Sequence, residues 1–423
     1  MFGRRSLLVT AWLVAACVSA EAGQDGQPAS PDASASTPSF SLRSSFKSSG
    51  LFSHLPDDPL LFPDSNAATG FWRYRVEPTV QVTDSASVEV AVETRLRLFS
   101  SPTGAVGVLP VEAAAPYRIR QLDWGLASSA NAEWRLEVDR AALRTRVGNA
   151  NLTIGRQAIG WGRGVLFGAI DLFSPFTPLE ADREWRRGVD AVRADVKLSD
   201  RTSLDMVGAA GTDIDHSAAA ARLRGYAGKA DLELVGGVRA RDVFGGVTSS
   251  AAVGDAELHG ELALFRTPAV PGSPHFSEER SIVKAVAGGS YRAAIGSGVL
   301  VYAEYHYSGF GATSPADILP LLADPAFQER YLRGDTQILT RHAIAGLASY
   351  EVSPELSWAA QWLLSPVDGS GVVVPSATLT FNDRLSLLLS GYLPYGRPPV
   401  GPVFGSEFGA TPLGFFVQLR AYR

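Results

Sequence analysis

Polar and apolar residues alternate along most of this chain, from about Ser39 to Arg423. In the segment 71–82 (FWRYRVEPTVQV), apolar residues recur at nearly every second position from Trp72 onwards. Side chains of a β-strand point alternately to its two faces, so this segment predicts a strand with one apolar face and one charged face. Such runs are about nine to thirteen residues long, which is the length that a tilted strand needs to cross a bilayer. The pattern therefore predicts an all-β fold, a closed transmembrane antiparallel β-barrel.

Short segments rich in Gly, Asn, Asp and Ser separate successive pairs of runs, and longer connections lie between them. Outer-membrane barrels show this arrangement, with short periplasmic turns and long external loops. The predicted short turns lie at 83–87, 148–151, 199–202, 228–230, 254–255, 295–298, 352–355 and 381–384. The predicted longer connections lie at 49–69, 100–130, 161–187, 211–217, 242–246, 267–280, 310–336, 365–370 and 394–411.

The alternation of turns and loops requires an even number of strands, which is usual for bacterial barrels. The count is about 18, and 16 is the alternative because the strands of 211–254 are rich in Ala and Gly and poorly marked. This count requires an additional strand over Ser39–Ser48 and places 117–124 in an external connection or a short hairpin within it. A phase slip after Trp134 predicts a β-bulge near Arg140-Ala141.

The connection 310–336 carries apolar residues at near-helical spacing after Pro315. These residues lie outside the predicted strands, where lipid cannot cover them. We therefore expect a short helix that packs over the mouth of the barrel. The alternative is an exposed, mobile loop.

The N-terminus has the features of a secretory signal peptide over residues 1–22. Two arginines precede an apolar run (LLVTAWLVAA), and small residues suitable for cleavage follow it. A lipoprotein signal is the alternative, because Cys17 follows the run and the segment 14–17 (VAAC) fits a lipobox loosely. Residues 23–38 are rich in Pro, Ser and Ala and predict a disordered tail. The predicted barrel then spans 39–423.

The composition excludes several other classes of protein. A net charge of −5 argues against a nucleic-acid partner, which would require a basic surface. Cys17 is the single cysteine, so cleavage of the signal removes disulfides and thiolate metal sites from consideration. The six histidines show no metal-ligand spacing, and no nucleophile elbow is present. We expect no cofactor, no metal and no enzymatic activity.

Residues 155–192 (GRQAIGWGRGVLFGAIDLFSPFTPLEADREWRRGVDAV) contain a Gly-rich bend followed by the sequences DLFSP and RRGVD. This block resembles one in porin-like outer-membrane barrels related to the alginate-export family and similar uncharacterised proteins. It covers about 40 of the 423 residues. The resemblance implies an 18-stranded barrel that passes anionic or neutral polymers or small solutes, with an external loop folded into the channel.

We expect the connection 161–187 to fold inward and form the constriction of such a channel. Its arginines and carboxylates could pin the loop to the inner wall or contact the solute directly. Arg156 would face the lumen only if Gly155 carried a bulge. The candidate residues in and beside the loop are Arg156, Gln157, Trp161, Arg163, Asp171, Arg183, Arg186, Arg187 and Asp190, with Glu93 and Arg95 on the facing wall.

These observations predict a passive channel in the outer membrane of a Gram-negative bacterium, for small polar or anionic solutes or polysaccharide. A non-conducting barrel that anchors or assembles cell-surface polymer is the alternative, and an outer-membrane hydrolase is a weaker one. The expected partners are outer-membrane lipid, the solute and the barrel-assembly machinery. The last strand departs from the usual assembly signal, because it ends in Arg423 instead of an aromatic residue.

Overall fold

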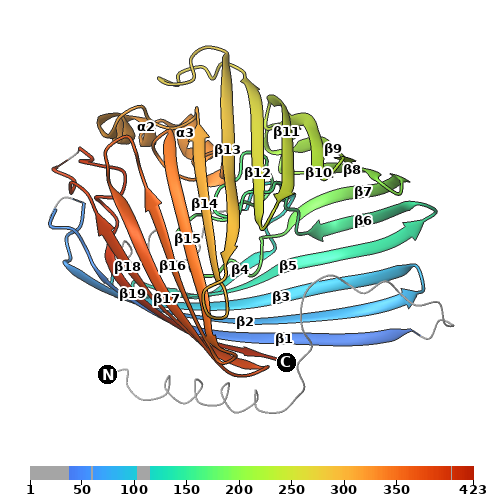
Figure 1. Cartoon of the computed structure of the whole chain (residues 1–423), viewed down its shortest axis with the longest axis horizontal. Helices are drawn as coiled ribbons and strands as arrows, with labels where there is room; N and C mark the ends of the chain where they lie inside the picture. The colour runs from blue at the N-terminus through green and yellow to red at the C-terminus, as the bar shows by residue number, and fades with distance from the viewer. Residues whose placement is uncertain (1–37, 59–60, 102–114, 402) are drawn as a thin grey trace.

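The computed structural model describes residues 38–58, 61–101, 115–401 and 403–423. The predicted signal peptide and all but the last residue of the predicted tail lie outside these residues. Within them, the strands form one antiparallel barrel (Figure 1).

The barrel is closed, because β1 (Ser39–His54) pairs with both β2 (Asn66–Thr83) and the last strand, β19 (Leu413–Tyr422). The sheet contains 19 strands, of which β4 (Asp123–Ser129) pairs only with β5 (Ala132–Val147) among the described residues. Because β3 (Ala86–Phe99) pairs directly with β5, the closed wall consists of the other 18 strands. The predicted fold class and the predicted count of 18 are confirmed. The remaining strands are β6 (Ala150–Gln157), β7 (Val189–Ser199), β8 (Thr202–Ala209), β9 (Ala218–Ala227), β10 (Ala230–Arg239), β11 (Asp242–Val253), β12 (Ala256–Thr267), β13 (Arg280–Ala293), β14 (Val299–Ser308), β15 (His342–Ser353), β16 (Leu356–Leu364), β17 (Gly371–Asn382) and β18 (Leu385–Tyr395).

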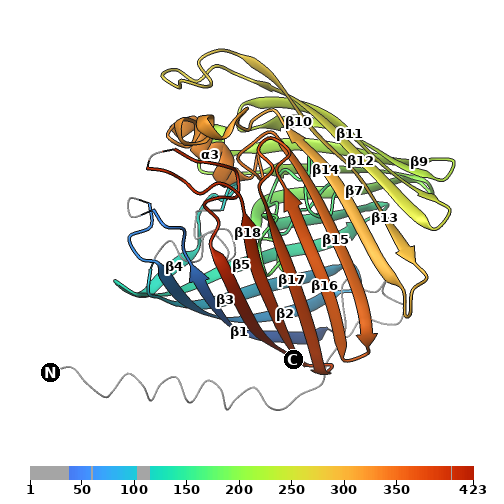
Figure 2. The same cartoon turned by 60° about the vertical axis from the view of Figure 1, so that its left-hand side comes forward.

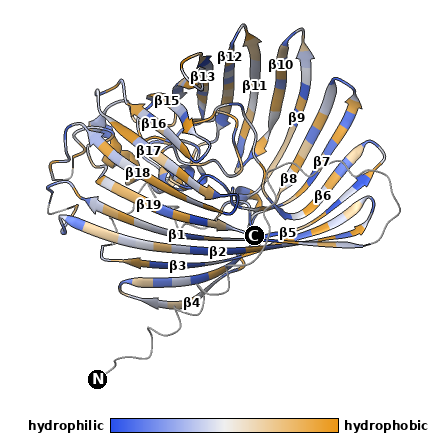
Figure 3. Cartoon of the chain, turned by 60° about the horizontal axis from the view of Figure 1, so that its bottom comes forward, coloured by the Kyte–Doolittle hydropathy of each residue, from blue (hydrophilic) through white to orange (hydrophobic). Residues whose placement is uncertain are grey.

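Inward and outward residues alternate along the wall as the sequence predicts (Figure 3). On β12, Leu258, Leu262 and Leu264 are about half exposed, whereas His259 and Glu261 are buried inside the barrel. A closed barrel pairs its backbone groups within the wall, so an apolar outward face can lie against lipid. No helix in the described residues is long and apolar enough to cross a membrane.

The strand ends agree with the predicted turns at one end of the barrel and differ in places from the predicted connections at the other. β1 ends at His54 and β2 begins at Asn66, so the connection predicted at 49–69 spans only 55–65. Each predicted short turn separates two strands, for example at 148–149 between β5 and β6. The connection predicted at 242–246 is wrong, because these residues lie within β11. The chain turns instead at Ala240 and Arg241, whose φ angles of 47° and 70° are typical of a two-residue hairpin.

The predicted bulge is confirmed in β5. Ala91 pairs with Arg140 and Val92 pairs with Val138, which leaves Asp139 as the extra residue. The bulge reconciles the two phases of the sequence pattern and presents the Asp139 carboxylate to the connection between β6 and β7, where it accepts from the backbone N–H of Gly188 at 2.8 Å.

The connection between β14 and β15 contains the predicted helical segment, as α2 (Ile318–Leu322) and α3 (Pro325–Arg333). Ile318 and Phe327 are fully buried, so the alternative of an exposed loop is wrong. Figure 2 shows α3 at the same end of the barrel as the other long connections. Two 3-10 turns, Ile214–His216 and Pro315–Asp317, complete the helical elements of the described residues.

Candidate constriction site

The connection 158–188, between β6 and β7, lies inside the barrel, and two glutamates of the wall hold its first half. Glu261 on β12 accepts from the backbone N–H of Gly164 at 2.8 Å and of Ala169 at 2.7 Å, and also from that of Arg163. Carboxylates that accept several backbone N–H groups form strong, charge-assisted hydrogen bonds.

Glu304 on β14 binds the residues between these two contacts. Its Oε1 accepts from the N–H of Val165 at 2.6 Å, and its Oε2 accepts from those of Leu166 at 2.9 Å and Phe167 at 3.0 Å. Tyr302 also donates its hydroxyl to Glu304, at 2.8 Å. The loop therefore wraps its backbone around two fixed negative charges, as a nest of N–H groups does around an anion.

This wrapping explains the glycines of the Gly-rich bend. Gly162 has a φ of +105°, and a Cβ there would lie 2.7 Å from Oε1 of Glu261. A Cβ on Gly164 would lie 1.9 Å from the carbonyl oxygen of Phe167. Larger residues at these positions would push the loop off the glutamates.

Side chains of the loop add contacts to the same wall. Trp161 donates its indole N–H to Asp205 on β8 at 3.1 Å, and its ring meets that of Phe173 edge-on at 5.2 Å. Arg163 donates to Glu233 on β10 at 3.1 Å. Two of the predicted candidates therefore pin the loop to the wall.

The second half of the loop reaches the opposite wall. Lys47 on β1 donates to Asp182 at 2.8 Å and lies 3.8 Å above the ring of Trp185, while Arg73 on β2 lies 3.3 Å from Asp182. Burial alone would raise the pKa of Asp182, but the positive charges of Lys47 and Arg73 outweigh it and hold that pKa below its usual value. The loop thus crosses the lumen from β12 and β14 to β1 and β2.

Arg156, Gln157 and Asp190 lie where the loop leaves and rejoins the wall. Arg156 donates to Asp190 at 2.7 Å and to the carbonyl oxygens of Gln121 and Val138 at 2.7 and 2.9 Å. β6 pairs with β5 and β7 without a shift of register at Gly155. The bulge that would turn Arg156 to the lumen is therefore not present. Gln157 is buried and donates to the carbonyl oxygen of Ala191 at 3.0 Å. These three residues hold segment 119–121 and the loop ends together.

Asp171, Arg183 and Arg186 make contacts within the loop itself. Arg186 donates to the Asp171 carboxylate and to the carbonyl oxygen of Ser174, the latter at 2.8 Å. Arg183 donates to the carbonyl oxygen of Pro178. Burial raises the pKa of Asp171, and the nearby charge of Arg186 only partly offsets this effect.

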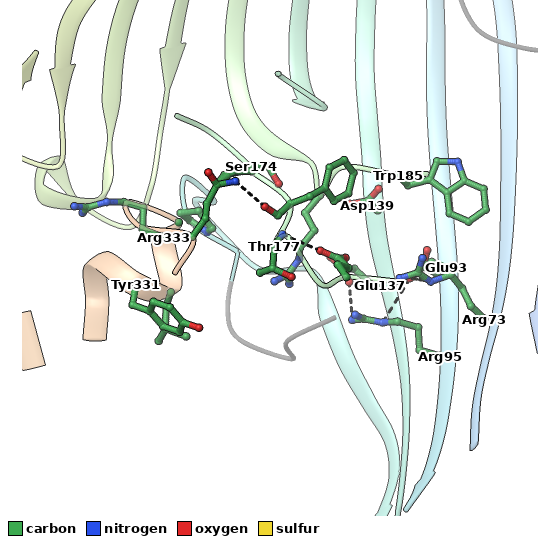
Figure 4. Close-up of a pocket in the computed structure, with 18 of the residues that line it drawn as sticks. Arg73, Glu93, Arg95, Glu137, Asp139, Ser174, Thr177, Trp185, Tyr331 and Arg333 are labelled. Atoms are coloured by element: carbon green, nitrogen blue, oxygen red, sulfur yellow. Dashed lines mark hydrogen bonds and ion pairs between the residues drawn. The ribbon is translucent and has the colours of Figure 1, made fainter. Parts of the chain in front are cut away.

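A cavity of about 150 Å³ remains between the loop, the wall of β2, β3 and β5, and the end of α3 (Figure 4). Of the predicted candidates, Glu93, Arg95 and Arg187 line it. Sequence reasoning did not select Glu137, Asp139, Tyr331 and Arg333, which also line it. The inward phase of β5 could have identified Glu137, whereas no local signal places α3 at this cavity.

The charged groups on the wall of the cavity are paired. Arg95 donates to Glu137 at 2.7 Å, and Arg75 donates to Asp139 at 2.8 Å. Arg118, from the connection between β3 and β4, is buried and contacts both of these carboxylates. Among the described residues, no group of three or more His, Cys, Asp or Glu side chains could hold a metal ion.

No protein-family model matches the sequence, and no curated protein matches it significantly. The resemblance to the alginate-export family therefore stays a prediction. The fold, however, is similar to solved structures of outer-membrane porins. OccAB1 of Acinetobacter baumannii superposes with a TM-score of 0.57 at 10% identity, over 91% of this chain and 96% of that protein. OccK9 (OpdG) of Pseudomonas aeruginosa gives 0.55 at 10% identity, over 90% of this chain and 98% of that protein. At such low identity, the likeness shows a porin-type barrel and no more.

Proposed function

We propose that this protein is a passive channel of the Gram-negative outer membrane for small polar solutes, neutral or anionic. The observation that carries the proposal is the loop 158–188, which crosses the lumen and leaves a cavity lined by charged and polar groups. Selective pores narrow their lumen in this way, so that solutes pass close to fixed polar groups. In this proposal the constriction is the gap between the loop and the strands β2, β3 and β5.

The dimensions favour small solutes over a polymer chain. The cavity of about 150 Å³ is smaller than the pockets of about 300–1,000 Å³ that enclose drug-sized ligands. Passage of a solute through such a channel makes and breaks no covalent bond. The barrel-assembly machinery would insert the protein, and outer-membrane lipid would cover its apolar outward face.

The rival proposal is a barrel that anchors or assembles surface polymer without conducting. Purified protein in a planar lipid bilayer separates the two proposals, because a channel gives step-like current increases and a sealed barrel gives none.

A variant locates the conducting path. Thr177 is an exposed residue of the loop that lines the cavity, so Thr177→Trp should lower the size of the current steps. Thr212→Trp, at an exposed position between β8 and β9, is the matched control and should leave the steps unchanged. A step size that is unchanged in Thr177→Trp would mean that the conducting path does not pass this residue.

A further inference from the structure

We infer that the constriction favours neutral solutes rich in hydroxyl groups, such as small saccharides, over carboxylates of the same size. This inference rests on the proposed channel function and names the solute class for the same site. Its basis is that the arginines around the cavity already have protein carboxylates as partners, whereas two hydroxyl groups of the lining remain available.

The pairing extends over the cavity wall and the end of α3. Arg73 lies 3.2 Å from Glu93, and Arg333 lies 2.6 Å from Asp335. Arg75 and Arg95 make the pairs with Asp139 and Glu137 described above. The fifth arginine of the lining, Arg187, lies close enough to Glu137 to interact with it electrostatically. Because each of these arginines lies beside a carboxylate, the lining presents ion pairs to the solute and carries little net positive charge.

A carboxylate solute would have to compete with these internal partners. Glu93, Glu137 and Asp139 are 3–6% exposed, so separating one of them from its arginine would leave a buried charge without a partner. Breaking a buried ion pair is strongly unfavourable. A neutral hydroxyl group needs no such exchange, because it can share hydrogen bonds with a paired guanidinium or carboxylate.

The more exposed lining groups suit a sugar ring. Thr177 and Tyr331 present hydroxyl groups, and neither hydroxyl has a hydrogen-bond partner among the described residues. Trp185 and Phe176 also line the cavity, but Lys47 lies over the ring of Trp185 and Arg186 lies over that of Phe176, so the hydroxyl groups carry the argument. Figure 4 shows Tyr331 across the cavity from the pair formed by Arg95 and Glu137. A solute between them would meet hydroxyl, aromatic and paired charged groups together.

The test compares three solutes of one size, glucose, glucuronate and glucosamine, as labelled tracers entering proteoliposomes in symmetric high salt. Glucose is expected to enter several-fold faster than glucuronate, and faster than glucosamine. Equal or faster entry of glucuronate would overturn the inference while leaving the channel function intact. Failure of all three tracers to enter would instead overturn the channel function.

A variant tests the cause of the preference. Glu137→Gln removes the carboxylate that Arg95 and Arg118 share, so the ratio of glucuronate to glucose entry should rise several-fold. Glu133→Gln is the matched control on the same strand, because Glu133 pairs with Arg135 and does not line the cavity. Glucose entry through each variant shows that the barrel has folded. An unchanged ratio in Glu137→Gln would show that the pairing does not set the preference.

Discussion

The carboxylate of Glu304 on β14 accepts a hydrogen bond of 2.9 Å from the backbone N–H of Leu166, in the loop that crosses the lumen. The two residues are 138 positions apart in the sequence. The loop has no regular secondary structure there, so its buried N–H groups need other partners. Glu304 and Glu261 supply those partners from the rigid wall. Two acidic side chains therefore fix the position of a loop that has no helix or strand of its own.

Replacing Glu304 with Gln should loosen the loop. The side-chain amide keeps one oxygen but places an NH₂ group against the N–H groups that the carboxylate accepted. Leaving buried donors without partners costs about 1–3 kcal/mol. We expect a lower thermal midpoint in detergent and more frequent current fluctuations in bilayers. Glu355→Gln is the control, because the exposed Glu355 accepts from the Ser353 hydroxyl at 2.8 Å in the turn between β15 and β16, far from the loop. Equal behaviour of the two variants would contradict this role for Glu304.

Gly162→Ala should displace the same loop through its backbone. The new Cβ would lie 2.7 Å from Glu261, and the φ of +105° is strained for any residue with a Cβ. The expected result is a larger and noisier single-channel conductance. Gly208→Ala on β8 is the matched control, because a Cβ there would meet nothing within 4 Å. A conductance that matches wild type in Gly162→Ala would show that the bend does not set the constriction.

The barrel was predictable because its signals are local. Alternation and turn residues act within a few positions, so they gave the strands and even the bulge at Asp139. The prediction failed at 242–246, in a region where the strands are rich in Ala and Gly and poorly marked. Gly246 lies within a strand instead, where a Cβ would come 2.7 Å from the carbonyl oxygen of Leu262. Glycine there permits a close approach between neighbouring strands.

The site was predictable only in part, because its contacts are long-range. The sequence identified the loop that crosses the lumen and several of the residues that hold it. It could not identify Glu261 and Glu304 as the anchors, since each looks like any other inward residue of its strand. The same limit applies to Tyr331, whose place at the cavity depends on how α3 packs. Contacts between segments that are distant in the sequence cannot be predicted from the residues of either segment alone.

Arg330 should be essential for the position of α3. Its guanidinium forms two hydrogen bonds with Asp242 on β11, of 2.7 and 3.0 Å, and a third with Asp335. Both aspartates have fully buried side chains, so Arg330→Met would leave buried negative charge undercompensated, at a cost of about 3–5 kcal/mol. We expect a marked fall in the thermal midpoint. Arg241→Met is the control, because it removes a solvent-exposed ion pair with Asp215 and should change the thermal midpoint little. Similar midpoints for both variants would argue against this anchor.

Asp324 should make the docking of the connection 268–279 depend on pH. It caps α3 by accepting from the N–H of Ala326 at 3.0 Å, and it also accepts from the Ser273 hydroxyl at 2.6 Å and from the N–H of His275 at 3.2 Å. Burial alone would raise the pKa of Asp324, but these hydrogen bonds outweigh it and hold the pKa below its usual value.

A depressed pKa means that the carboxylate stabilises the fold above the ordinary Asp pKa of about 4. This contribution is lost as pH falls through the depressed value. Thermal midpoints measured from neutral pH down to about pH 3 should therefore fall more steeply in wild type than in Asp324→Asn, which cannot titrate there. Glu329→Gln is the control, because the exposed Glu329 lies on the same connection as Asp324 but does not cap α3, and its charged partners His216 and Arg333 lie 3.6 and 3.9 Å away. Its pH profile should stay close to that of wild type, and an equally flattened profile would assign the effect to the connection as a whole.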